Sequence, residues 1–256
     1  MRGPRPFTFF LACATLLLLT VRAEAASFQV DPSTFVLSAT ATNGLLAVRN
    51  LGDEIVRVQV SAFVWNQTPG GDVDLAPTHD LVFFPSILTI APHDARNVRV
   101  STAFEGIFAS TTVEKTYRLI VEELAPTVKV SSPTSAVRVL IRMSVPVFLQ
   151  PAVLRPVPRI ERISLQGNHA TFVVTNPGTA HFITKKVRLY VTAHDGRTLF
   201  DTTLGGWYVL AQGLRTYDVA LPPTACASGT SVTIELETDQ GNAVEHANAS
   251  CANASH

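Results

Sequence analysis

The sequence predicts an all-β protein made of two immunoglobulin-like β-sandwich domains, and two observations support this prediction. After residue 26 the chain consists of short runs rich in β-branched and aromatic residues, separated by turn residues, in two sets of about seven runs. Residues 150–158 (QPAVLRPVP) lie between the two sets. They contain prolines but no glycine, so we expect a stiff, extended connector. We expect an N-terminal domain at residues 27–149, a linker at residues 150–158 and a C-terminal domain at residues 159–256.

Residues 1–26 are predicted to be a secretory signal peptide. Arg2 and Arg5 precede an apolar run at residues 7–21, and the following Ala23-Glu24-Ala25 has the small residues that signal peptidase prefers. A membrane anchor is the alternative, but the run is shorter than the roughly 20 residues that a spanning helix needs. No later segment is long and apolar enough to span a membrane, so we expect an exported protein without membrane insertion.

Composition and charge exclude several classes of partner. The formal net charge is zero, which gives no electrostatic reason to expect nucleic acid or an acidic membrane surface. With an apolar content of 46%, the chain can build sizeable cores in both domains.

The cysteines indicate a disulfide. Cys13 leaves with the signal peptide, so Cys226 and Cys251 remain as a pair that an oxidising compartment would join. Metal binding is the alternative, but the pair has no CxxC spacing and only His246 and His256 nearby. We predict the disulfide, and no metal site.

In the N-terminal domain, each expected strand is bounded by turn residues. Residues 54–65 are rich in β-branched and aromatic side chains, and the cluster 66–74 (NQTPGGDVD) that follows is a predicted turn. Pro85 divides residues 80–90 into two short strands, because proline is hard to seat in a central strand. The remaining strands of this part are predicted at residues 27–39, 44–50, 96–101 and 112–123.

The strand at residues 136–148 has the clearest pattern in the chain. Its odd-numbered positions from 137 to 147 are all apolar, which is the period of two expected when successive side chains point to opposite faces. Pro146 lacks an N–H group, so this end of the strand is not expected to pair on both sides. An apolar strand with an unpaired edge aggregates unless it is covered or has a partner.

The C-terminal domain repeats the β character. Asn176-Pro177-Gly178 and Asp195-Gly196 are turn signals, since proline presets one torsion and glycine accepts a positive φ, and residues 239–242 are a predicted hairpin turn. Strands are predicted at residues 159–165, 170–176, 183–194, 213–221 and 231–238, with a final run after residue 241.

Motifs of catalysis are missing from the sequence. No GxSxG, HExxH, P-loop or dinucleotide fingerprint occurs. His79-Asp80, His93-Asp94 and His194-Asp195 lie at predicted turns, where such pairs are usually solvated. We therefore expect neither an enzyme nor a cofactor.

The order and spacing of several motifs resemble the periplasmic chaperones of the chaperone-usher pilus pathway. In the first half these are FFP at residues 83–85, IAP at 90–92, NVRV at 97–100, YRL at 117–119, VEEL at 121–124 and FLQP at 148–151. In the second half they are VTNPG at residues 174–178 and HF at 181–182. The resemblance extends from Ser27 to Cys251.

This resemblance implies two domains arranged as a boomerang, in which the last strand of the first domain completes the fold of a pilus subunit in the periplasm. The lent side chains would be Val137, Val139 and Ile141, with Met143 as a fourth candidate, and an outer-membrane usher would receive the subunit. Two alternatives remain open. The aliphatic side chains of this strand could pack inside their own domain, and the chain could be a free-standing immunoglobulin-like adhesion or binding module.

Two residue sets of the family are incomplete in this chain. The positions that normally hold the client's terminal carboxylate correspond to Thr34 and Pro146, neither of which is charged. Either the chain belongs to a divergent branch of the family whose pattern near residues 144–148 differs in this way, or other cations take over. Arg142 is our candidate for a replacement anchor, and Lys185 and Lys186 are alternatives.

The family's interdomain salt-bridge network is the second incomplete set. Its acids correspond to Glu114 and Asp239, and its arginine corresponds to Gln150. Gln150 could donate hydrogen bonds, or Arg155 in the linker could substitute for the arginine.

Overall fold

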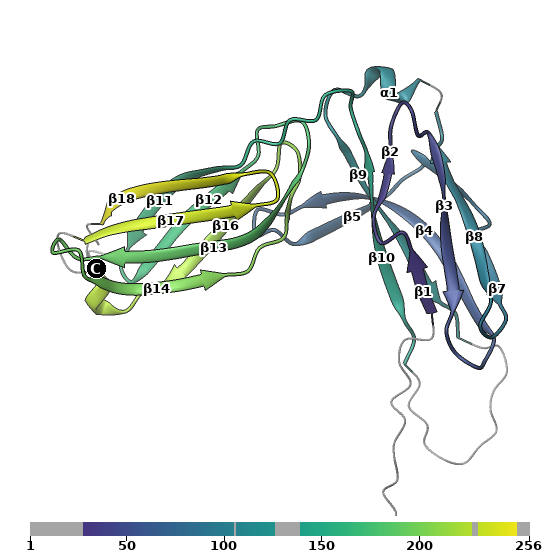
Figure 1. Cartoon of the computed structure of the whole chain (residues 1–256), viewed down its shortest axis with the longest axis horizontal. Helices are drawn as coiled ribbons and strands as arrows, with labels where there is room; N and C mark the ends of the chain where they lie inside the picture. The colour runs from purple at the N-terminus through teal and green to yellow at the C-terminus, as the bar shows by residue number, and fades with distance from the viewer. Residues whose placement is uncertain (1–27, 105, 126–138, 227–229, 250–256) are drawn as a thin grey trace, which may run out of the picture.

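The computed structural model describes residues 28–104, 106–125, 139–226 and 230–249, and these residues form two β-sandwiches that meet at an angle, like the arms of a boomerang (Figure 1). The fold class predicted from the sequence is therefore confirmed. The predicted signal peptide and Val137 lie outside the described residues. Within the described part of the chain, no helix has the length and apolar character needed to cross a membrane.

The N-terminal sandwich has two sheets packed over one core. Along the first sheet the strand order is β1 (Phe28–Asp31), β3 (Asn43–Asn50), β8 (Ala95–Thr102) and β6 (Leu81–Phe84). The second sheet has the order β2 (Phe35–Leu37), β10 (Arg142–Leu149), β9 (Lys115–Glu123), β4 (Val56–Gln67) and β5 (Val73–Pro77), and β7 (Ile87–Ile90) also pairs with β4. One helical turn, α1 (Ile107–Ser110), precedes β9.

Two of the predicted strands are split between the sheets. The run at residues 80–90 becomes β6 and β7, separated at Pro85 as predicted, and these strands join different sheets. The run at residues 27–39 was predicted as one strand but becomes β1 and β2, with Pro32 between them. This split lets the start of the chain contribute to both sheets, and it brings β2 beside β10.

The predicted turn at residues 66–74 is shorter in the structure. β4 continues to Gln67 and pairs with β5, so only the tip of this segment turns. The resulting hairpin reaches the second sandwich, where the carbonyl of Pro69 accepts the N–H of Thr216 at 2.8 Å.

The C-terminal sandwich also has two sheets. One contains β11 (Arg159–Gln166), β12 (His169–Thr175) and β16 (Leu214–Ala220). The other has the order β14 (Thr198–Leu204), β13 (Phe182–Thr192), β17 (Thr230–Thr238) and β18 (Asn242–Ala249), with β15 (Tyr208–Val209) also paired to β13. β14 and β15 were missed in the sequence because β14 (TLFDTTL) is a half-exposed edge strand without clear alternation.

Asn176, in the Asn-Pro-Gly turn, ties the linker to the C-terminal sandwich. Its side chain is fully buried, and its Nδ2 donates to the carbonyl of Ala180 at 2.8 Å. Its Oδ1 accepts the N–H groups of Val157 and Gly178, each at 3.1 Å. Because a buried amide must have its partners, this turn fixes where the linker enters the second domain.

The predicted disulfide lies outside the described residues. Cys226 ends a short 3-10 helix (Pro223–Cys226), but its side chain and Cys251 lie outside what the structure describes. The bridge stays a prediction.

Candidate functional site: the free edge of β10 and the cleft between the sandwiches

β10 is paired along its whole length on one side only. Its residues Arg142–Leu149 pair with β9, whereas on the other side β2 covers only Val147–Leu149. The end of the strand after Pro146, which was predicted to lack a partner on one side, is therefore paired on both sides, because Pro146 removes only its own N–H from that edge. Among the described residues, nothing pairs with this second side between Arg142 and Pro146. We call this stretch the free edge of β10.

Two hydrogen bonds show which backbone groups face the free edge. The N–H of Glu123 donates to the carbonyl of Ile141 at 2.8 Å, so the odd-numbered residues of β10 turn their backbone groups toward β9. The N–H of Gln150 donates to the carbonyl of Leu37 in the segment of β2, so the even-numbered residues turn theirs outward. Pro146 therefore stands where its missing N–H would point away from β9, and it removes no bond from the β9–β10 ladder.

The apolar row formed by β10 and the residues just before it leaves the core step by step. Val145 and Val147 are buried in the N-terminal core, and Met143 and Ile141 are partly buried against it. Val139 is 76% exposed. The aliphatic side chains at the end of β10 therefore pack inside their own domain. Toward the start of the strand they become more exposed, and the apolar row continues into solvent.

Arg118 is a buried cation beside aromatic rings of both sandwiches. It lies on β9 directly across from Pro146, and only 4% of the residue is exposed. Its Cζ lies 3.6 Å from the ring centroid of Trp65, and its Nε and Nη2 are buried without a hydrogen-bond partner. Burial lowers the pKa of the Arg118 guanidinium below its ordinary value. A carboxylate bound here would supply the missing acceptors in bidentate geometry.

Arg118 is part of the motif YRL, but the motif gave no reason to expect an anchor there. The cations that were predicted as replacement anchors lie elsewhere. Arg142 is exposed at the start of β10, in register with Glu122 of β9. Lys185 and Lys186 are exposed on β13, and Thr34 is exposed between β1 and β2. None of these has the enclosed setting of Arg118.

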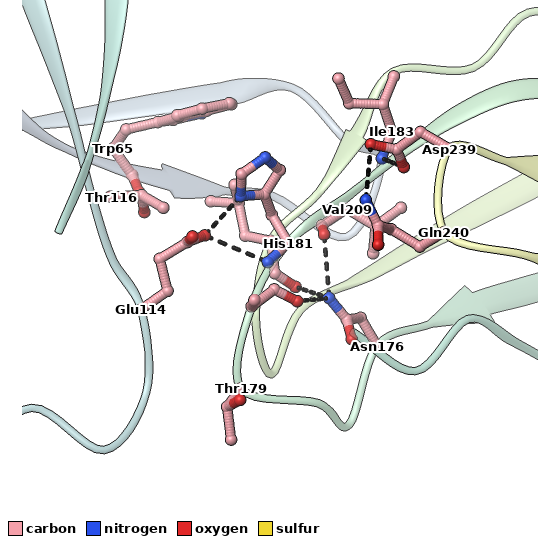
Figure 2. A network of polar contacts seen from close by, with 12 residues as sticks. Trp65, Glu114, Thr116, Asn176, Thr179, His181, Ile183, Val209, Asp239 and Gln240 are labelled. Atoms are coloured by element: carbon pink, nitrogen blue, oxygen red, sulfur yellow. Dashed lines mark hydrogen bonds and ion pairs between the residues drawn. The ribbon is translucent and has the colours of Figure 1, made fainter. Parts of the chain in front are cut away.

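Glu114 connects the two sandwiches through His181 (Figure 2). Its Oε1 accepts the backbone N–H of His181 at 3.1 Å and bonds the Nδ1 of the same residue at 2.6 Å. The backbone N–H of Glu114 also donates to the carbonyl of Thr179 at 2.9 Å. The imidazole stacks on Phe148 of β10 with ring centroids 3.8 Å apart, so the contact is both polar and aromatic.

The two other residues predicted for the interdomain network bond elsewhere. The Oδ1 of Asp239 accepts the N–H of Ile183 at 2.7 Å within the C-terminal sandwich, as Figure 2 shows. Gln150 bonds through its backbone to Leu37 of the N-terminal sandwich. His181 takes the place beside Glu114 that the resemblance gave to Gln150.

Gln67 adds a second polar connection between the sandwiches. Its Nε2 donates to the carbonyl of Tyr208 at 2.8 Å, and its Oε1 accepts the N–H of Leu210 at 3.0 Å. Beside it, Trp65, Phe148 and Leu210 form a small buried cluster that draws on both domains. The contact between the sandwiches thus combines apolar packing with hydrogen bonds, and among the described residues the buried polar atoms that have no partner here are Nε1 of Trp65, Oε2 of Glu114, and Nε and Nη2 of Arg118.

Comparisons with known proteins agree with this architecture. Residues 27–155 match the family model described as "Pili and flagellar-assembly chaperone, PapD N-terminal domain". None of the curated proteins compared with the chain matches it.

Several solved structures share the fold. One is the CsuC-CsuE chaperone-tip adhesion subunit pre-assembly complex from the archaic chaperone-usher Csu pili of Acinetobacter baumannii, with a TM-score of 0.57, 16% identity and coverage of 86% of this chain and 98% of that chain. The class 5 fimbriae chaperone CfaA has a TM-score of 0.54 and 13% identity, over 86% of this chain and 98% of that one. The CupB2 chaperone of Pseudomonas aeruginosa has a TM-score of 0.53 and 17% identity, over 86% of this chain and all (100%) of that one. At these identities the likeness shows a shared fold.

Proposed function

The chain belongs to the family of pili and flagellar-assembly chaperones, and we propose that it binds pilus subunits in the periplasm by lending them the free edge of β10, then passes them to an outer-membrane usher. Its fold and family are those of chaperones rather than of enzymes. The observation that carries the proposal is the free edge itself: unpaired backbone groups next to an apolar row that extends into solvent.

Strand addition uses both features of the free edge. The outward N–H and C=O groups of Arg142 and Ser144 offer hydrogen bonds to a client strand that pairs beside β10. The side chains of Val137, Val139, Ile141 and Met143 would fill the groove of the client, and burying each stabilises the complex by roughly 1.5 to 3 kcal/mol before ordering costs. Ile141 and Met143 are already partly buried in the free protein, so, of the described side chains, Val139 has the largest exposed fraction that a client could cover.

Arg118 supplies the anchor in this mechanism. The uncharged Thr34 and Pro146 cannot hold a carboxylate as an ion pair, and Arg142 is a solvated side chain. Arg118 projects from the strand next to Pro146, and its guanidinium is enclosed without an acceptor. A terminal carboxylate of the client would relieve that unpaired charge, so we assign the anchor to Arg118 rather than Arg142.

Coexpression with a pilus subunit tests the proposed function. The full chain is expected to raise the amount of soluble subunit in the periplasm and to elute with it as a one-to-one complex in size-exclusion chromatography. The control is the same subunit carrying its own complementary strand as a C-terminal fusion, which should need no chaperone. Equal amounts of unfused subunit with and without the chain, and no complex, would point instead to a free-standing adhesion or binding module.

A further inference from the structure

Trp207 of the second sandwich lies over the guanidinium of Arg118. The Cζ of Arg118 is 5.2 Å from the ring of Trp207, and the rings of Trp207 and Trp65 are 6.0 Å apart. Trp65 is fully buried, whereas Trp207 is 40% exposed. The cation therefore lies near the face of one buried indole and one half-exposed indole.

The backbone around Trp207 is held at three points. A Cβ at Gly206 would overlap the side chain of Thr184 on β13, so only glycine allows this close approach. The carbonyl of Trp207 accepts the N–H of Thr184 at 2.8 Å. The carbonyl of the next residue, Tyr208, accepts the side chain of Gln67 from the first sandwich at 2.8 Å. The backbone that carries the indole is thus held by contacts to both sandwiches.

The arrangement defines the chemistry of what binds. The guanidinium lacks hydrogen-bond acceptors, which an oxyanion would supply. The half-exposed indole next to it offers a flat apolar surface. The rings of Trp65, Trp207 and Tyr208 lie within 6.0 Å of the Cζ of Arg118, and 4% of the residue is exposed. A chain end has both required groups, a carboxylate and the side chain of its last residue.

We propose that Trp207 reads the last residue of the client: the terminal carboxylate pairs with Arg118, and a large apolar final side chain packs on the indole. This inference rests on the proposed function, because it places the end of the client beside the free edge of β10. It gives the second sandwich a part in selecting clients.

Peptides that carry the last strand of a pilus subunit test this inference. Four peptides are needed: one ending in Phe and one ending in Ala, each made with a free C-terminal carboxylate and with a C-terminal amide. Their affinities for the full chain would be measured by titration calorimetry. The wild-type chain should prefer the Phe ending by about 10-fold, as expected for an aromatic contact, and the free carboxylate over the amide. In Trp207→Ala the preference for Phe should fall to about 1-fold, whereas Trp207→Phe should keep most of it. Val244→Ala, which truncates a half-exposed side chain on β18, is the control and should behave like wild type.

The outcomes separate the inference from the proposed function. If Trp207→Ala keeps the full preference for Phe, or if wild type shows none while still binding the peptides, Trp207 does not read the final residue and the lending of β10 stands. If no peptide and no subunit binds the wild-type chain, the proposed function fails and takes the inference with it. The chemical unfolding midpoints of the variants show whether a loss of binding comes from misfolding. If Trp207→Ala is misfolded, Trp207→Phe decides: a retained preference for the Phe ending supports the inference, and a lost preference in this folded variant contradicts it.

Discussion

Replacing Arg118 with methionine is expected to weaken subunit binding by roughly 10- to 100-fold, because hydrogen bonds to a charged group contribute about 1.5 to 3 kcal/mol. The free protein should unfold at the same urea concentration or a higher one. The reason is that Nε and Nη2 of Arg118 have no partner to lose, and removing an unpaired buried charge relieves a cost of desolvation. Titration calorimetry with a purified subunit and urea unfolding of the free chain measure the two effects.

Two further variants make this result specific. Arg99→Met removes an exposed arginine from β8 in the other sheet of the same domain and should change neither quantity. Arg118→Lys keeps the charge but loses the planar fork that stacks on Trp65, so its affinity should lie between wild type and methionine. Unchanged subunit affinity in Arg118→Met would remove the guanidinium from the mechanism.

Val139→Glu is expected to reduce subunit binding by at least about 10-fold, whereas Leu140→Glu should leave it close to wild type. In the proposed complex the side chain of residue 139 enters the apolar groove of the client, and burying an unpaired carboxylate there is costly. The side chain of residue 140 points to the opposite face of an extended strand. The measurement is the fraction of subunit that copurifies with each variant from periplasmic extracts.

This pair is matched in the charge that is introduced and in sequence position. Both side chains are exposed in the free protein, at 76% and 46%, so neither change should lower its free energy of unfolding by more than about 0.5 kcal/mol. An equal loss of binding in the two variants would indicate a general charge effect. Full binding by Val139→Glu would mean that this face of β10 is not the one that is lent.

The sequence was sufficient for the fold where the pattern was local. Alternation along residues 136–148 predicted a strand with one apolar face, of which β10 forms the part from Arg142 onward whereas residues 139–141 are not in a strand, and Pro85 predicted the break between β6 and β7. β14 escaped prediction because Leu199 and Phe200 are adjacent apolar residues that both pack partly on the core, which breaks the alternation of this half-exposed edge strand. The split at Pro32 depends on the first segment pairing with both β3 and β10, which is a property of the assembled sheets.

The site was harder to predict because its members are distant in sequence. Glu114 and His181 lie 67 positions apart, and each belongs to a different sandwich. Arg118 looks like an ordinary strand residue until Trp65 and Trp207 enclose it. One local signal was present: Arg118 is the single cation in the apolar run YRLIV, and a charge between such neighbours is a candidate for a buried role.

The central claim, that a client strand pairs with the free edge of β10, is tested most directly by amide hydrogen exchange at single residues. In the free protein the outward N–H groups of Arg142 and Ser144 should exchange fast, while those of Met143 and Val145, which face β9, should be protected. In the saturated complex with a pilus subunit, Arg142 and Ser144 should slow by at least about 100-fold, since each N–H then sits in a ladder that opens only with the complex. Fast exchange at both residues in a saturated complex would contradict strand pairing at this edge.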